Sequence, residues 1–155
     1  MYSIMPSKRN YSKNNKRQLT QKHRRTNKYT NAYIVAMFLQ MLNTVKLYHW
    51  KTHSYATHKA TDELYSKLNE NIDSFVEVLL GKTGSRVNLT GQKTLPLHDY
   101  NNETNFKREI EQYKQFLINM NKDADINITN NSDLLNIRDE LLGNLNQFTY
   151  LLTFN

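Results

Sequence analysis

The sequence predicts an all-α protein that folds as a four-helix bundle. Its 155 residues include only four Gly and two Pro, too few for the many tight turns of an all-β protein. Hydrophobic residues make up 38% of the chain, which is enough for one modest core but not for a second domain. Four segments repeat apolar residues at spacings of three and four, the period of an amphipathic helix.

The first two predicted helices form a hairpin. The first covers residues 31–50 and places an apolar stripe on one face, formed by Ile34, Phe38, Met41, Leu42, Val45, Tyr48 and His49. The second covers residues 56–80 and ends before Gly81, where a left-handed cap costs little. Because only a short turn around residues 51–55 joins them, the two helices should be antiparallel neighbours.

A long connection separates this hairpin from the next predicted helix. Residues 81–102 hold three of the four Gly together with Pro96, a composition typical of a crossover loop. The third helix is predicted over residues 103–121, with a polar break at 122–131 after it.

The fourth helix completes the bundle. It should begin at Ser132 or Asp133 as N-cap and continue through Leu152. Two helical hairpins joined by one long crossover make the ferritin-like four-helix bundle rather than a simple up-and-down bundle.

The positive charge of the chain is concentrated at its N-terminus. Residues 1–28 contain nine of the 21 basic residues and none of the 14 acidic ones. The basic residues are Lys8, Arg9, Lys13, Lys16, Arg17, Lys22, Arg24, Arg25 and Lys28. Nearly free of aliphatic side chains, this segment is predicted to be a disordered, flexible arm ahead of a helical domain over residues 29–155. Such an arm neutralises phosphates and binds nucleic acid; the alternatives are a solubilising or targeting tail, or contact with an anionic membrane.

Several classes of protein are excluded by what the sequence lacks. Without cysteine there is no disulfide framework, zinc ribbon, Cys-ligated iron–sulfur cluster or thiol nucleophile, so any metal must be held by nitrogen and oxygen ligands. No apolar stretch approaches the roughly 20 residues of a membrane-spanning helix. The basic N-terminus has no apolar core after it, so no secretory signal is expected.

Two pairs of potential metal ligands lie on the second predicted helix. His58 and Asp62 are four residues apart and share a face, as do Asp73 and Glu77. The pairs lie about 16 Å apart along the helix, so one subunit cannot close a site from both. If the helix meets its own antiparallel copy across a two-fold axis, each pair faces the other pair of the partner chain. The ordinary alternative is a solvated helix face that includes Ser66 and Glu70.

His49 is a further candidate ligand. It ends the first helix on the stripe that holds Phe38 and Val45, so its imidazole should point toward the bundle. The Trp50 ring next to it is expected to pack, with screening of the site as a second role. Imidazole and carboxylate ligands suit iron, manganese or zinc, and they leave positions open for peroxide or dioxygen. A Glu-x-x-His pair on each of two helices, usual for a di-iron centre within one bundle, is missing from the sequence.

At these residues the sequence resembles the mini-ferritins called Dps, DNA-binding proteins from starved cells. The resemblance is carried by Leu47–Trp50, by the segment His58-Lys59-Ala60-Thr61-Asp62-Glu63-Leu64-Tyr65, and by Ile72-Asp73-Ser74-Phe75-Val76-Glu77. It implies a ferroxidase centre between two-fold-related subunits, with His49, His58 and Asp62 from one chain and Asp73 and Glu77 from its partner. The connection from His49 to His58 is shorter than in that family and lacks its Gly-Pro, which makes His53 an alternative ligand.

The resemblance also implies a function. We expect a protein that binds iron, with manganese or zinc as alternatives, and oxidises Fe(II) with peroxide or dioxygen while the arm holds DNA. The expected assembly is a homodimer, with a higher oligomer beyond it, located in the cytoplasm or nucleoid, or in a virion if the source is viral. The rival hypothesis is a non-catalytic, ferritin-like structural protein that packages nucleic acid. A third reading is an interaction module whose tail contacts RNA or an acidic protein.

Overall fold

The structure is a computed structural model that describes residues 29–154, and the basic segment over residues 1–28 lies outside the described part. Within that part the chain forms four α-helices and no β-strand, which confirms the predicted all-α, four-helix fold. The helices are α1 (Asn31–Lys51), α2 (Tyr55–Thr83), α3 (Glu103–Asp123) and α4 (Ser132–Leu151), with a short 3-10 helix at Ile128–Asn130 before α4.

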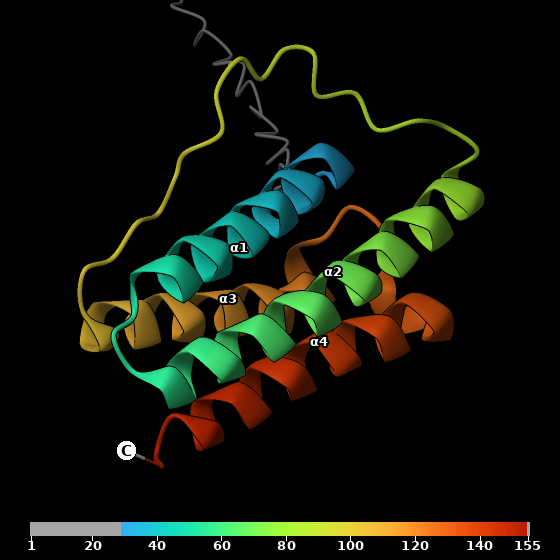
Figure 1. Cartoon of the computed structure of the whole chain (residues 1–155). Coiled ribbons are helices and arrows are strands. Elements are labelled where there is room, and N and C mark those ends of the chain that lie inside the picture. The colour runs from blue at the N-terminus through green and yellow to red at the C-terminus, as the bar shows by residue number, and fades with distance from the viewer. Residues whose placement is uncertain (1–28, 155) are drawn as a thin grey trace, which may run out of the picture.

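The four helices form two antiparallel hairpins (Figure 1). After α2 the chain returns along the whole length of the molecule, past α1, and α3 therefore runs in the same direction as α2 (Figure 1). α2 packs against both α1 and α4, and α4 also packs against α3.

The turn between α1 and α2 is short because both helix ends are capped within it. The backbone N–H of Thr52 donates to the carbonyl of Tyr48 at 3.0 Å and closes α1. Two residues later Ser54 caps α2, its hydroxyl accepting from the backbone N–H of Thr57 at 3.2 Å. Only residues 52–54 lie between the helices, so the end of α1 and the first turn of α2 are held side by side.

Two predicted helix ends are wrong. α2 does not stop before Gly81 but continues to Thr83, where Gly84 takes the left-handed cap with φ 63°. A glycine inside a helix costs only about 1 kcal/mol relative to alanine, so Gly81 alone does not end a helix that packs on its neighbours. The N-cap of α4 is Asn131 rather than Ser132 or Asp133, because the carbonyl of Asn131 already accepts from the backbone N–H of Leu135.

Aromatic rings fill the core between the two hairpins. Phe38 of α1 meets Phe75 of α2 edge to face at 5.2 Å and Phe116 of α3 at 6.0 Å. Nearer the α1–α2 turn, Tyr48 stacks on Phe106 at 3.9 Å. The hairpins are thus joined by α1–α3 side-chain contacts as well as by α4.

Just before α3, residues 98–100 of the crossover contact α3 and α1 in turn. Both oxygens of the buried Glu109 carboxylate accept hydrogen bonds, from His98 Nδ1 at 2.7 Å and from the Tyr100 hydroxyl at 2.8 Å. Asp99, between these two residues, faces the other way and forms an ion pair with Lys51 at the end of α1. Burial and the hydrogen bond to Glu109 raise the pKa of Tyr100 to about 12. We call the contacts of His98 and Tyr100 with Glu109 the crossover clasp.

The chain enters the bundle through a fixed backbone contact. Tyr29 forms a β-bridge with Ala124 in the connection between α3 and α4. Its N–H donates to the carbonyl of Asp123 at 2.7 Å, and its carbonyl accepts from the N–H of Asp125 at 2.8 Å. The first described residue therefore lies at the end of the bundle opposite the α1–α2 turn.

None of the helices within residues 29–154 is long and apolar enough to cross a membrane.

Candidate functional site

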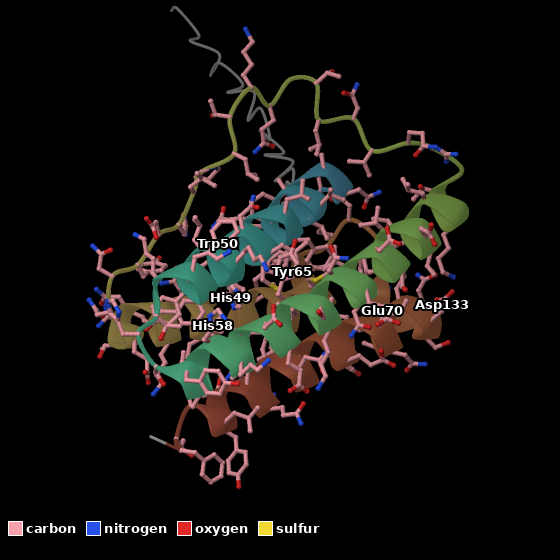
Figure 2. All side chains as sticks on the ribbon, in the orientation of Figure 1. His49, Trp50, His58, Tyr65, Glu70 and Asp133 are labelled. Carbon is pink, nitrogen blue, oxygen red and sulfur yellow. The ribbon has the colours of Figure 1, made fainter. Side chains whose placement is uncertain are left out.

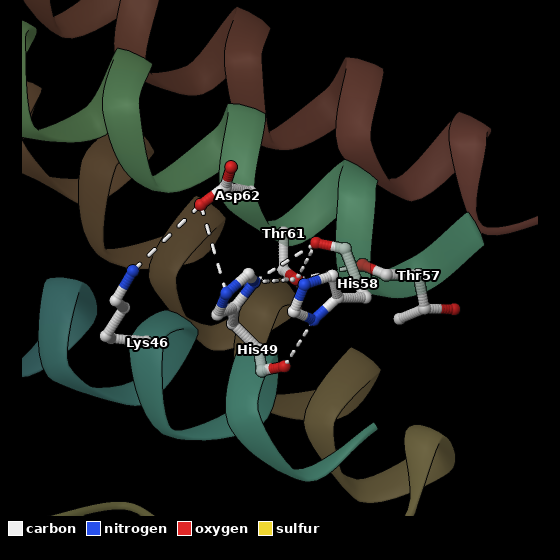
Figure 3. Close-up of polar contacts among 6 residues, drawn as sticks. All are labelled: Lys46, His49, Thr57, His58, Thr61 and Asp62. Atoms are coloured by element: carbon white, nitrogen blue, oxygen red, sulfur yellow. Dashed lines mark hydrogen bonds and ion pairs between the residues drawn. The ribbon is translucent and has the colours of Figure 1, made fainter. Parts of the chain in front are cut away.

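Two histidines meet where α1 ends and α2 begins. The rings of His49 and His58 stack with their centroids 3.9 Å apart and their planes 23° from parallel (Figure 3). His49 is only 7% exposed, as the stripe on α1 predicts, and His58 is half-buried. The stacking is possible because the three-residue turn brings the last turn of α1 against the first turn of α2.

Each histidine is oriented by the backbone of the other. His49 Nδ1 lies 3.1 Å from the carbonyl oxygen of His58, and His58 Nδ1 lies 3.0 Å from the carbonyl oxygen of His49 (Figure 3). A carbonyl oxygen can only accept, so both Nδ1 atoms carry hydrogen. In the neutral imidazoles both Nε2 atoms are therefore unprotonated acceptors, the state that a metal-binding histidine needs.

A carboxylate faces one of these nitrogens. Asp62 Oδ1 lies 3.9 Å from His49 Nε2, too far for a hydrogen bond. The same oxygen lies 4.0 Å from Lys46 Nζ, and the Asp62 side chain is 55% exposed (Figure 3). The Lys46 ammonium also lies 4.7 Å from the centre of the Tyr65 ring, which helps to hold it near Asp62. The Asp62 carboxylate thus has a cationic neighbour within the single chain.

The second ligand pair lies elsewhere on α2. Asp73 and Glu77 are both exposed, and they follow Asp62 by 11 and 15 residues, about 16 Å and 22 Å along the helix axis. Figure 2 shows the His49 and His58 end of α2, with Glu70 farther along the same helix toward Asp133. Between residues 29 and 154 of one chain, no group of three or more His, Asp or Glu side chains is arranged to hold a metal ion. In the described part of one chain, His49, His58 and Asp62 therefore lie apart from Asp73 and Glu77.

Comparison with known proteins identifies the family to which this chain belongs. A model of a family of unknown function (DUF5856) matches residues 49–152. The chain belongs to the DUF5856 family. The match begins at His49 and includes His58, Asp62, Asp73 and Glu77, whereas the basic segment over residues 1–28 lies outside it. No match was found among the curated proteins or among the solved structures.

The other sequence-predicted residues lie apart from the two histidines in this DUF5856 chain. His53, the alternative ligand, is exposed in the α1–α2 turn. Trp50 was expected to pack, but it is 67% exposed in the single chain, because it follows the buried His49 by one residue and so points off the buried stripe. Lys46 lies over its ring at 5.8 Å. The nine basic residues from Lys8 to Lys28 fall outside the described part of the chain.

Sequence reasoning missed the groups that orient the histidines. The buried Thr61 hydroxyl lies 3.3 Å from His49 Nδ1 and donates to the backbone carbonyls of Thr57 and His58. The available signal was the spacing of Thr57 and Thr61 on the buried stripe of α2, where polar residues need partners. The crossover clasp was also missed, although Glu109 lies three residues after Phe106 and four before Tyr113, on the buried stripe of α3.

Proposed function

We propose that this protein is a ferritin-like, Dps-type protein that takes Fe(II) as substrate at the interface of a homodimer and oxidises it. In this proposal each of two equivalent sites combines His49, His58 and Asp62 of one subunit with Asp73 and Glu77 of the other. Manganese and zinc are the alternative metals, since the same nitrogen and oxygen ligands suit them. The basic segment over residues 1–28 would contact nucleic acid.

The observation that carries the proposal is the reciprocal pairing of His49 and His58. Each Nδ1–H is bonded to a backbone carbonyl, so both Nε2 atoms are acceptors without any further rearrangement. Carbonyl partners on the remote nitrogen are the usual outer contacts of metal-binding histidines, because they fix the tautomer and the ring orientation.

The arrangement of the helices supports the ferritin-like part of the proposal. Two antiparallel hairpins are connected by the crossover over residues 84–102, with α2 and α3 parallel, rather than by a short turn (Figure 1). In four-helix bundles one long crossover of this kind is the feature that distinguishes ferritin-like folds from up-and-down bundles.

The exposed residues of α2 support the dimer. When an α-helix packs antiparallel on its own copy around a two-fold axis, residues at equal distances before and after the axis face each other. An axis between residues 67 and 68 places Asp73 opposite Asp62 and Glu77 opposite His58. Asp62, Asp73 and Glu77 are exposed in the single chain, as residues that meet only across an interface must be.

The chain's residues have distinct roles in the proposed reaction. His49 and His58 would supply neutral nitrogen ligands, whose rings are oriented by the hydrogen bonds of their Nδ1 atoms to backbone carbonyls. The three carboxylates would balance the charge of the bound ions. Two Fe(II) ions give up two electrons to one hydrogen peroxide, which takes two protons and leaves as two water molecules. Lys46, 4.0 Å from Asp62 in the single chain, would have to give up this contact when Asp62 binds an ion.

The decisive experiment measures iron oxidation in a ligand variant. Anaerobic protein receives Fe(II) and then hydrogen peroxide, and the ferric absorbance is followed with time. We expect the double variant Asp73→Ala and Glu77→Ala to lose most of the rate. The matched control, Glu63→Ala and Glu140→Ala, removes two exposed carboxylates outside the proposed site and should retain it. Equal rates in the wild type and the ligand variant would exclude the ferroxidase, and a monomer in sedimentation would exclude the shared site.

A second candidate function is a non-catalytic structural protein that packages nucleic acid through the basic segment, and the Lys46 contact favours only the absence of catalysis. Since Lys46 lies 4.0 Å from Asp62, this carboxylate has a cationic neighbour without any metal. Removal of residues 2–28 separates the two functions. Nucleic-acid retention should be lost in both cases, whereas peroxide-driven iron oxidation by the truncated chain should survive only if the site is a ferroxidase.

A further inference from the structure

A groove of about 400 Å³ runs between α1 and α3 at the end of the bundle where the chain enters. Its aromatic residues are Tyr29, Tyr33 and Phe116, and Arg108, Gln112 and Gln115 of α3 are among its polar residues. The groove is far from the histidine pair, because His49 follows Tyr33 by 16 residues, about 24 Å along α1. The proposed iron chemistry makes no use of it.

The aromatic part of the groove is a supported stack. Tyr33 is 40% exposed, and its ring lies 5.2 Å from that of Tyr29, with 26° between the planes. Phe116 lies 5.2 Å from Tyr29 and 6.2 Å from Tyr33. Tyr29 and Phe116 are each only 4% exposed, so they form a buried support beneath an accessible tyrosine. A ring held in this way can stack on a planar ligand with little further loss of entropy.

Three polar residues of α3 suit the edges of such a ligand, and the one carboxylate among the described residues of the lining, Glu111, is paired with Lys114. Gln112 and Gln115 are exposed and three residues apart, so they share a face of α3 beside the aromatic stack. Side-chain amides both donate and accept, which is the chemistry that reads the edge of a nucleobase. Arg108, one turn before Gln112, adds a guanidinium that can stack or contact a phosphate.

The groove begins directly after the most basic part of the sequence. Lys28 is the last of nine basic residues in a segment without acidic ones, and Tyr29 lines the groove. The two backbone hydrogen bonds of Tyr29 to residues 123 and 125 fix the position of this junction. A polyanion whose phosphates contact residues 8–28 is therefore brought to the mouth of an aromatic groove.

We propose that this groove binds unpaired bases, so that the protein prefers single-stranded nucleic acid to duplex. The inference rests on the nucleic-acid part of the proposed function and adds the class of ligand. The basic segment supplies charge, which does not distinguish single strands from duplexes by base contacts. Tyr33 supplies stacking, which requires bases that are not already stacked in a helix.

The test compares three probes on the full chain. They are an oligothymidylate of about 20 nucleotides, the same strand in a duplex with oligoadenylate, and inorganic polyphosphate. We expect the wild type to bind the single strand more tightly than the duplex. Tyr33→Leu keeps an apolar side chain against Phe116 but removes the ring, and it should weaken single-strand binding about tenfold. Polyphosphate binding should not change, because that probe has no bases.

Control variants separate this inference from the function on which it rests. Tyr55→Leu removes an exposed tyrosine at the other end of the bundle and should have no effect. Gln112→Ala with Gln115→Ala, at exposed positions, should weaken single-strand binding about threefold even if Tyr33→Leu impairs folding.

The outcomes that contradict the proposal are distinct. If deletion of residues 2–28 abolished binding while Tyr33→Leu and the glutamine variant both bound like the wild type, the groove would not be a base-binding site and the basic segment alone would bind. Undiminished binding after the deletion would overturn the role of the basic segment, and no binding of either nucleic acid by the full chain would overturn the nucleic-acid function itself. A change of oligomeric state in Tyr33→Leu would show that a second copy occupies the groove instead.

Discussion

The crossover clasp gives a direct prediction about stability. Glu109 is 4% exposed and accepts two hydrogen bonds as a carboxylate, at 2.7 Å from His98 and 2.8 Å from Tyr100. Hydrogen bonds to charged groups contribute about 1.5–3 kcal/mol each, whereas neutral ones contribute about 0.5–1.5 kcal/mol. Glu109→Ala removes both and leaves the two donors beside a space that the carboxylate had filled.

The expected loss is smaller than the sum of the two bonds. The His98 side chain is 34% exposed and can turn toward water, and the buried carboxylate no longer has to be desolvated. We therefore expect Glu109→Ala to lower the free energy of unfolding by about 2–3 kcal/mol. Glu109→Gln keeps one acceptor and the volume of the side chain, and should lose about 1–2 kcal/mol.

Urea unfolding at pH 7, followed by circular dichroism at 222 nm, measures both values. The matched control is Glu140→Ala, which removes an exposed glutamate from α4 and should change stability by no more than about 0.5 kcal/mol. If Glu109→Ala and Glu140→Ala were indistinguishable, the clasp would contribute nothing and the crossover would be held by its other contacts alone.

Three further predictions concern single groups. Native Tyr100, with its pKa raised to about 12, keeps its proton to a higher pH than the unfolded chain does. Stability should therefore fall by about 1 kcal/mol between pH 10 and 12 in pH-dependent urea unfolding, and Tyr100→Phe should remove this part of the decrease. Gly84→Ala should lower the midpoint of thermal unfolding, because the φ of 63° at this position disfavours any residue with a Cβ. Gly81→Ala should raise the midpoint, because this glycine lies inside α2 and a Cβ there meets nothing within 4 Å. Each substitution should change the free energy of unfolding by about 1 kcal/mol. Thr44→Val removes the 2.8 Å partner of the buried Tyr113 hydroxyl and should cost about 1–3 kcal/mol in urea unfolding, and an unchanged midpoint would mean that this bond is unimportant.

The helices were predictable because their apolar residues recur every three or four positions. Residues such as Phe38, Phe75 and Phe116 form the stripes that packing requires, and a stripe is visible in the sequence. Helix ends were less certain, since the tertiary support that carries α2 through Gly81 has no local signal. His49 was correctly expected to face inward, because it lies on the same stripe.

The arrangement around the histidines depends on the angle between α1 and α2, which cannot be predicted from the sequence. That His49 and His58 each bond to the other's carbonyl follows from how closely a three-residue turn brings two helix ends together. That His98 and Tyr100 reach Glu109 likewise depends on the path of a loop of about 20 residues. The pairing of Asp62 with Asp73 across a dimer stays a prediction, because it concerns two chains rather than one.

The bridge between Tyr29 and Ala124 has a mechanical consequence. Any tension applied to the segment before Tyr29, for example by a polymer that it holds, reaches first the two backbone bonds to Asp123 and Asp125. The pull is thus borne by the α3–α4 connection instead of unwinding α1 from its first turn. A force on the N-terminal segment would therefore leave the stacked rings of His49 and His58, at the other end of the bundle, in place.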